Sequence, residues 1–480
     1  MDLKQKTARG VFWSGIERFS VQGIMFIVQV ILARLLLPSD YGLIGMLVIF
    51  IAVSQSFIDS GFSNALIRKQ DRTETDFSTV FYFNIIVGIL FYLLLFLSSS
   101  FIAVFFKAPI LEILIKVLAL TLFLDSFSVI QRTIFTIEVD FKTLAKASLI
   151  SVIISGIVAI WLAYSGYGVW SLVIQSVLNS TINMLMLWVF SKWKPLFVFS
   201  WMSFEVLFSY GSKILLSGLI DTVYKNLYTL VIGKKFNAYD LGYYTRADQF
   251  SQFPSLNISV IISRVTFPLL SSIQNDNERL RIIYSKYLKL SAFIIFPLMT
   301  GLAAVASPLI NLLLTPKWNG AVVLLQILCF SYMWYPIHSI NLNLLQVKGR
   351  SDLYLKLEIY KKIIGVSILF FSIPFGIEVM CAGTILSSVI FLIINTHYTG
   401  KFINVSLFKQ IQDLLPMFLC SMSMCIIIWF SIKIVSLDSL KLLLGLLVGL
   451  IYYFSITYIT KSPELLELLS LIKKTKNGRK

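Results

Sequence analysis

Long hydrophobic stretches separated by short polar connections repeat along the chain from Val11 to Thr460. Each is about 20 residues long, enough for a helix to cross a hydrocarbon layer of about 30 Å. This pattern predicts an all-α polytopic membrane protein. An even number of spans places both ends of the chain on one side of the membrane. Fourteen spans are predicted, over residues 11–33, 41–67, 79–101, 111–131, 147–165, 168–190, 206–232, 248–272, 290–314, 321–347, 357–374, 378–399, 411–432 and 441–460.

The composition agrees with this pattern, because 57% of the residues are hydrophobic and only 14% are charged. An ordinary soluble domain has about 25% charged residues. The first apolar segment contains Glu17 and Arg18 and has no small-residue cleavage site. It is also too long for a secretory signal peptide, so we expect a retained first helix.

The net charge of +17 is distributed unevenly over the predicted connections. The N-terminus, the connections after even-numbered spans and the C-terminal tail hold 28 lysines and arginines, against 8 in the opposite connections. Positive residues mark cytoplasmic loops, so we expect both termini in the cytoplasm. This topology and the acidic lipids of the inner leaflet account for the charge, and no nucleic-acid partner is expected.

Two short segments resemble each other at an offset of 200 residues. Ala33–Gly42 and Gly233–Gly242 each begin with a small and a basic residue and end in Asp-x-Gly. Asp-x-Gly is also common in ordinary turns. However, the two segments also occupy matching positions, one between the first and second predicted helices and the other between the seventh and eighth. We therefore predict a parallel repeat, with six-helix lobes over residues 1–200 and 201–400 and two additional helices with a basic tail over 401–480.

Polar residues recur at helical spacing on one face of the first two helices of each predicted repeat. Ionisable groups in a span cost several kcal/mol unless they face protein or water, so they are functional candidates. We expect these faces to line one central cavity. The candidates are Glu17, Arg18, Gln22 and Gln29 in the first helix, Gln55 and Asp59 in the second, Lys213, Asp221 and Lys225 in the seventh, and Asn257 and Arg264 in the eighth.

Several of these residues have a simpler structural interpretation. Asp221 and Lys225 are four residues apart and can neutralise each other, as Glu17 can for a neighbouring cation. Lys213 can extend to the membrane surface, and Asp59 can be a buried hydrogen-bond acceptor or a coupling-ion site. By contrast, Arg18 and Arg264 have no opposite charge on their own helix faces. A cavity with uncompensated arginines favours an anion such as a phosphate.

Two further polar stripes, Gln175–Asn179–Asn183 and Trp334–His338–Asn341, can contact sugar hydroxyls or join helices to one another. The chain has no G-x-x-x-x-G-K-[ST] phosphate loop, only two histidines and no Cys/His cluster. We therefore expect no ATP motor, metal or other cofactor. Among enzymes, a membrane polysaccharide polymerase is the alternative to a transporter. It is disfavoured because such an enzyme needs a sizeable catalytic region outside the membrane, and every predicted connection is shorter than about 20 residues.

Several motifs of the first 200 residues resemble the polysaccharide-transport flippases of the multidrug/oligosaccharidyl-lipid/polysaccharide exporter superfamily. In the second half the resemblance is mainly in layout and in Phe267–Leu270. The motifs are Leu32–Gly42, Asp59–Arg68, Gln131-Arg132 with Phe141-Lys142, Gly166–Ser171 and Trp193–Pro195.

The resemblance implies fourteen helices in two six-helix lobes plus a terminal pair, and a cavity with alternating access. It also implies export of undecaprenyl-pyrophosphate-linked oligosaccharides across the bacterial cytoplasmic membrane for lipopolysaccharide, capsule or exopolysaccharide. The implied partners are membrane lipids and polysaccharide-assembly proteins. The chain would be a transporter and not an enzyme.

Cations in the central helices of such proteins bind the pyrophosphate. The candidates are Arg18 and Arg264, with Lys213 and Lys225, and they rest on spacing alone. The membrane potential or ion antiport through Glu17, Asp59 or Asp221 would drive transport. A cation-coupled drug antiporter of the same superfamily is the alternative transporter.

Overall fold

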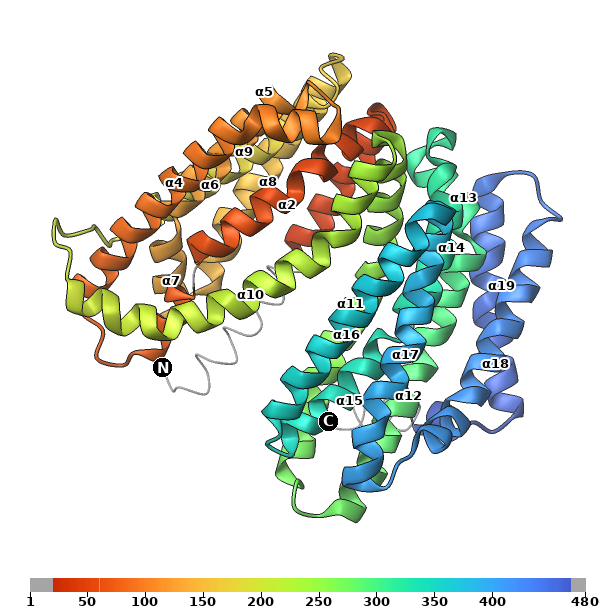
Figure 1. Ribbon diagram of the computed structural model, residues 1–480. Helices are drawn as coiled ribbons and strands as arrows, with labels where there is room; N and C mark the ends of the chain where they lie inside the picture. The colour runs from red at the N-terminus through yellow and green to blue at the C-terminus, as the bar shows by residue number, and fades with distance from the viewer. Residues whose placement is uncertain (1–19, 60, 468–480) are drawn as a thin grey trace, which may run out of the picture. The chain divides into compact units, whose positions relative to one another are not determined.

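The computed structural model describes residues 20–59 and 61–467, and every regular element within them is helical (Figure 1). The chain forms two compact units, residues 1–242 and 243–480. The boundary near residue 200 that the repeat suggests stays a prediction.

The first unit contains short and long helices that pack around α4 and α2. The longest are α4 and α10, of 33 and 35 residues. Its helices are Ser20–Leu35, α2 (Pro38–Asp59), α3 (Phe62–Arg68), α4 (Glu74–Phe106), α5 (Leu111–Leu118), α6 (Leu120–Ser126), α7 (Val129–Ile137), α8 (Phe141–Tyr164), α9 (Trp170–Phe190) and α10 (Trp201–Lys235).

The second unit begins within α11, whose first residues belong to the first unit. Two short 3₁₀ turns interrupt its helices. The elements are α11 (Ala238–Ser272), α12 (Asn277–Ala304), α13 (Ala306–Leu314), η1 (Pro316–Trp318), α14 (Gly320–Tyr332), α15 (Tyr335–Val347), α16 (Ser351–Ser372), η2 (Ile373–Phe375), α17 (Ile377–Ile403), α18 (Leu407–Ile432) and α19 (Asp438–Ile459).

Among the described residues, 11 helices are long and apolar enough to cross a membrane, or up to 12 if one bent pair is a single span. Two further predicted spans fall on Ser20–Leu35, which is shorter, and on α16, which contains five charged side chains. The polytopic helical architecture is therefore confirmed, while the number fourteen stays a prediction.

The predicted span 111–131 differs from the structure, because it is divided among α5, α6 and α7 with a bend of 41° after Ser126. The Ser126 hydroxyl donates to the Phe123 carbonyl at 2.6 Å, and the Ser128 hydroxyl donates to the Asp125 carbonyl at 2.9 Å. Such local bonds compete with the regular helical ladder. The segment therefore bends without a proline or glycine.

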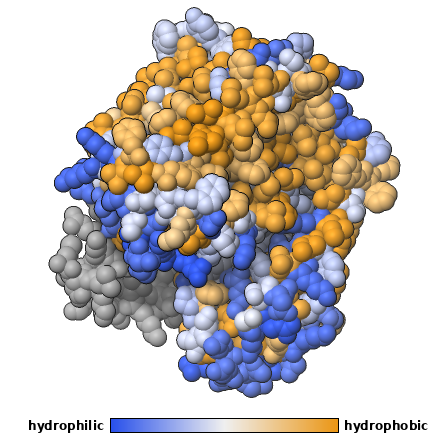
Figure 2. All heavy atoms as spheres, turned by 60° about the vertical axis from the view of Figure 1, so that its left-hand side comes forward, coloured by the Kyte–Doolittle hydropathy of each residue, from blue (hydrophilic) through white to orange (hydrophobic). Residues whose placement is uncertain are grey.

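Large hydrophobic side chains remain exposed on the outer helices. On α4, Leu97, Phe101 and Val104 are 75–79% exposed, and Figure 2 shows hydrophobic residues covering much of one face. A contiguous apolar surface of this extent is unusual on a soluble monomer and fits contact with lipid. The hydrophobic residues of the predicted spans therefore lie both in the core and on the surface.

Two glycines allow α2 and the start of α11 to approach each other closely within the first unit. A Cβ atom on Gly42 would lie 1.7 Å from the Ala238 carbonyl oxygen, and one on Gly242 would lie 1.9 Å from the Pro38 carbonyl oxygen. No side chain fits at these distances. The contact is reciprocal, since Pro38 and Gly42 correspond to Ala238 and Gly242 at the 200-residue offset.

Candidate substrate-binding site

Helices α2 and α10 pack along each other and bring together several residues that the sequence selects. Their polar faces meet where the Ser56 hydroxyl lies 3.0 Å from the Thr222 hydroxyl. One turn away, the Gln55 amide donates to the Asp59 carboxylate at 3.4 Å. Asp221 is half-buried on the same stretch of α10 and has an interaction partner.

Unlike Asp221, the two candidate lysines of α10 have no interaction partner among the described residues. Lys213 and Lys225 are both exposed, and neither forms a hydrogen bond or ion pair with another described residue. The suggested neutralisation of Lys225 by Asp221 is therefore not formed in this structure. Two ammonium groups in a predicted span remain free to bind an anion.

The first helix is described only from Ser20 onward, so Glu17 and Arg18 lie outside the described residues. Gln22 and Gln29 are half-buried. The Gln22 side-chain oxygen is buried without a hydrogen-bond partner among the described residues, while Gln29 has a partner. An unpaired buried amide is costly and is satisfied by a ligand or water.

The second unit carries the other two candidates on α11. Arg264 is exposed and forms no hydrogen bond or ion pair with another described residue. The Asn257 amide donates to the Phe253 carbonyl of its own helix at 2.8 Å. Nearby, the Ser263 hydroxyl lies 3.0 Å from the Ser339 hydroxyl and joins α11 to α15. Arg264 thus lies on a helix that its neighbours hold in place.

Arg132 is a polar residue of the first unit that the spacing argument missed. It is exposed on α7, and its positive charge acts on the carboxylates of both Asp59 and Asp125. The Ser180 side chain on α9 lies next to the Asp125 carboxylate. Sequence reasoning placed Arg132 in a loop, and the only signal for it was the family motif Gln131-Arg132.

Asp248 is a second missed residue, on α11 of the second unit. The Tyr332 hydroxyl donates to its carboxylate at 2.7 Å, and the Gln252 amide donates to the Tyr332 oxygen at 3.2 Å. Ser255 donates to the Tyr332 carbonyl at 2.7 Å. These bonds connect α11 with α14 through a polar network in a predicted span.

The stripe that includes Asn341 joins helices. Tyr284 of α12 and Thr399 of α17 donate to the Asn341 side-chain oxygen at 2.8 and 2.7 Å, and Gln410 of α18 lies within 3.4 Å. All four side chains are at most 1% exposed. Of the two roles that the stripe left open, Asn341 has the interhelical one. His338 of the same stripe is buried, and its two ring nitrogens have no hydrogen-bond partner among the described residues.

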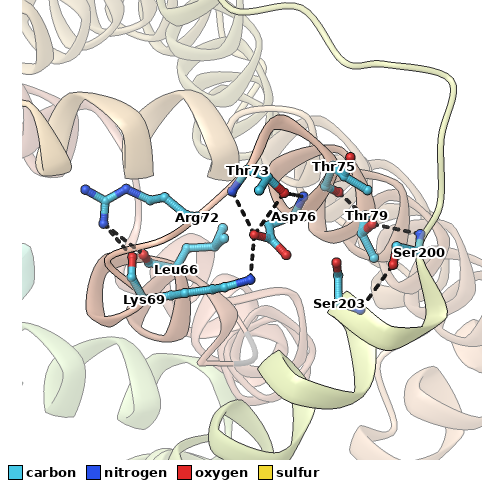
Figure 3. A network of polar contacts seen from close by, with 9 residues as sticks. All are labelled: Leu66, Lys69, Arg72, Thr73, Thr75, Asp76, Thr79, Ser200 and Ser203. Carbon is cyan, nitrogen blue, oxygen red and sulfur yellow. Dashed lines mark hydrogen bonds and ion pairs between the residues drawn. The ribbon is translucent and has the colours of Figure 1, made fainter.

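The connection between α9 and α10 is fixed to the beginning of α4 (Figure 3). Its backbone N–H groups at Leu196 and Ser200 donate to the hydroxyls of Ser78 and Thr79 at 2.9 and 3.0 Å. The Trp193 indole donates to the Glu74 carboxylate at 2.7 Å. The family motif Trp193–Pro195 is therefore part of an anchored connection.

The beginning of α4 is itself a closed capping box. The Asp76 amide donates to the Thr73 hydroxyl at 3.3 Å, and the Thr73 amide donates to the Asp76 carboxylate at 2.8 Å. Lys69 adds an ion pair to the same carboxylate at 2.7 Å (Figure 3). The Asp76 side chain is only 1% exposed, so this paired charge stabilises the anchor.

Helical spans in two units, free cations on α10 and α11, and unpaired amide groups define a multi-pass membrane protein with the features of a transporter. The polysaccharide biosynthesis protein family matches residues 31–323, and the chain belongs to that family. The resemblance to polysaccharide flippases found in the sequence is thereby confirmed.

The sequence is 28% identical to the teichuronic acid biosynthesis protein TuaB of Bacillus subtilis (strain 168), over 73% of either chain. It is 27% identical to the lipopolysaccharide biosynthesis protein WzxC of Escherichia coli (strain K12), over 75% of this chain and 74% of WzxC.

Two solved structures share the fold. The lipid II flippase MurJ in an inward closed conformation matches with a TM-score of 0.76 at 16% identity, covering 93% of this chain and 99% of MurJ. An inward-facing multidrug resistance MATE family transporter of the MOP superfamily matches with a TM-score of 0.62 at 16% identity, covering 82% of this chain and 99% of the transporter.

Proposed function

We propose that the protein moves undecaprenyl-pyrophosphate-linked oligosaccharides across the cytoplasmic membrane by alternating access, for the synthesis of a cell-surface polysaccharide. The family and the names of the relatives support this class of cargo. The observation that carries the proposal is a set of exposed cations in predicted spans that have no partner among the described residues. They are Lys213, Lys225 and Arg264.

A pyrophosphate explains why such cations are present. An uncompensated cation in a span is costly, so it is retained where it faces water or a ligand. Arginine binds phosphate oxygens with two parallel hydrogen bonds, and lysine supplies a mobile point charge. In this proposal Lys213, Lys225, Arg264 and Arg18 bind the pyrophosphate, and the polar faces of the first helix and α2 contact the sugars.

Alternating access requires two bodies that move against each other. The two compact units are suitable bodies, and the reciprocal contact of Gly42 and Gly242 within the first unit supports the predicted parallel repeat. In the proposed arrangement of fourteen helices, α18 and α19 are the appended pair. The lipid tail stays in the bilayer while the headgroup crosses.

The membrane potential favours this movement. An anionic headgroup that moves outward gains about 2.3 kcal/mol per charge for each 100 mV of inside-negative potential. Asp59 and Asp221, with Glu17, remain the candidates for a coupling ion. A potential clamped by valinomycin and potassium would separate the two drives in one preparation.

The test is transbilayer movement of a fluorescent polyprenyl-pyrophosphate oligosaccharide in proteoliposomes. Arg264→Gln should slow movement at least about tenfold, because one charge-assisted hydrogen bond contributes about 1.5–3 kcal/mol. Arg350→Gln is the matched control, since Arg350 is an exposed arginine already paired with Asp352 at 2.7 Å. Its rate should equal that of the wild type.

The outcomes separate the site from the function. Wild-type rates in Arg264→Gln would remove the cation from the site and leave the flippase in place. Wild-type protein that is correctly reconstituted but moves no polyprenyl-pyrophosphate oligosaccharide would overturn the proposed cargo.

A further inference from the structure

A cavity of about 600 Å³ lies in the second unit, away from the candidate cations of α11. It is bounded by the first half of α12, the connection between α17 and α18, the start of α18 and the residues after α19. The sequence assigns these segments to the cytoplasmic side, at the level of the inner-leaflet headgroups. Its charged lining includes Lys286, Lys289, Lys409, Asp413, Glu464 and Glu467.

The cations of this cavity are not fully neutralised. Lys286 pairs with Glu467. Lys289 and Lys409, by contrast, share the single carboxylate of Asp413 at 3.2 and 3.5 Å. One positive charge is therefore left over, carried by two ammonium groups that approach one carboxylate from α12 and α18.

The same cavity also contains an unneutralised negative charge. Glu464 is only 8% exposed, and it accepts a hydrogen bond from the Ser462 hydroxyl at 2.6 Å. It forms no ion pair with any other described residue. The remaining lining cation, Arg281, is already paired with Glu278. A carboxylate with restricted access to water is stabilised by a cation that enters the cavity.

The inner wall of the cavity is rigid. Tyr284 on α12 and Gln410 on α18, neighbours of the lining residues, are fully buried and both bond to Asn341. This network holds α12 and α18 at a fixed separation. The charged groups are thus positioned before any ligand arrives, which lowers the cost of binding.

Apolar side chains are exposed beside the charged lining. Ile282, itself part of the lining, is 62% exposed, Phe408 beside Lys409 is 78% exposed, and Leu466 beside Glu467 is 56% exposed. A ligand with a polar head and an acyl chain would bury these groups at about 25 cal/mol per Å². A small soluble ion would leave them in contact with water.

We propose that this cavity binds a phospholipid of the inner leaflet whose headgroup carries both a phosphate and a primary ammonium, as in phosphatidylethanolamine. The phosphate binds the cation pair Lys289 and Lys409, and the ammonium binds Glu464. A headgroup with only a phosphate would leave the Glu464 charge unpaired. The site is separate from the proposed cargo site, and its occupancy is measurable without transport.

The experiment measures retained lipid by native mass spectrometry after the full-length protein is extracted from nanodiscs with equal phosphatidylethanolamine, phosphatidylglycerol and phosphatidylcholine. We expect the wild type to retain phosphatidylethanolamine at least about tenfold over the other two. Glu464→Gln should reverse the preference toward phosphatidylglycerol, because the spare positive charge remains. Lys409→Gln should lower retention of both lipids.

The control is Lys441→Gln, which removes one partner of the Lys441–Asp438 ion pair at the other end of α19 and should retain lipids as the wild type does. The reversal in Glu464→Gln is a gain that misfolded protein cannot produce. Equal retention of all three lipids, or a wild-type preference for phosphatidylglycerol, would overturn the proposal. Displacement of the lipid by millimolar soluble phosphoethanolamine would show that a free headgroup, and not a lipid, is the ligand.

Discussion

The crossing of α2 with the start of α11 and the middle of α10 lie in the same unit but obey different constraints. At the crossing, Gly42 and Gly242 leave no space for even one methyl group. In the middle of α10, Gly218 has no heavy atom within 4 Å of an added Cβ, and Lys213 and Lys225 are exposed. At the crossing, the available volume limits which residues fit. In the middle of α10 there is space for a side chain, and the charge of the residue is the relevant property. Substitutions can test this difference.

The largest effect is expected at the crossing. Gly42→Ala or Gly242→Ala should destabilise the protein by about 3 kcal/mol or more, because the new methyl group must displace a backbone carbonyl. Alanine is otherwise the better helix former by about 1 kcal/mol. Gly218→Ala should therefore be neutral or slightly stabilising. Reversible unfolding in mixed micelles measures all three variants. Equal stability of Gly42→Ala and Gly218→Ala would refute the close contact.

An intermediate effect is expected where polar groups act through packing. Asn341→Leu removes the acceptor of the Tyr284 and Thr399 hydroxyls and should cost about 2 kcal/mol. The control is Asn226→Leu on α10, whose amide donates, within residues 20–59 and 61–467, only to the Thr222 carbonyl of its own helix at 2.9 Å. It should cost less than about 1 kcal/mol. If both variants unfold at the same detergent concentration, the buried network contributes nothing specific.

The smallest effect on stability is expected from the free lysines. Lys213→Gln and Lys225→Gln should change the free energy of unfolding by less than about 0.5 kcal/mol, since neither side chain has a partner in the part of the chain that the structure describes. In the same proteoliposome assay, both should slow oligosaccharide movement. A large loss of stability would show that these charges have a structural role and would weaken their assignment to the cargo.

Much of the helical layout could be predicted from hydrophobicity alone, but the helix ends and breaks could not. The hydrophobic pattern predicts a span at 79–101, whereas α4 begins at Glu74. The helix starts there because Thr73 caps it and forms a capping box with Asp76. The Thr-x-x-Asp spacing of this capping box is visible in the sequence. The bend after Ser126 had no such signal, since no proline or glycine marks it.

The candidate site was predictable only where the relevant residues follow one helix face. Lys213, Lys225 and Arg264 were selected in this way, and all three side chains are exposed in the structure, while their role in binding stays a prediction. Arg132 was missed because its relation to Asp59 depends on how α7 packs against α3, which no periodicity records. The repeat gave the correspondence of Gly42 and Gly242 but not their mutual contact.

Gly61 illustrates the same limit. Its positive φ of 70° suits glycine, and an added Cβ would lie 2.5 Å from the Gly211 carbonyl oxygen on α10. The family motif Asp59–Arg68 includes this glycine without indicating its neighbour. Only the packing of α3 against α10 explains why a side chain is excluded there.

The anchored connection between α9 and α10 has a practical consequence for anyone who wishes to divide or label the protein. Residues 191–200 form no helix, yet hydroxyls of α4 hold the backbone at Leu196 and Ser200. A protease that needs about ten extended residues will cut there slowly, and an inserted epitope tag will break the anchor. Co-expressed halves separated within this segment would have to re-form those bonds before they could assemble.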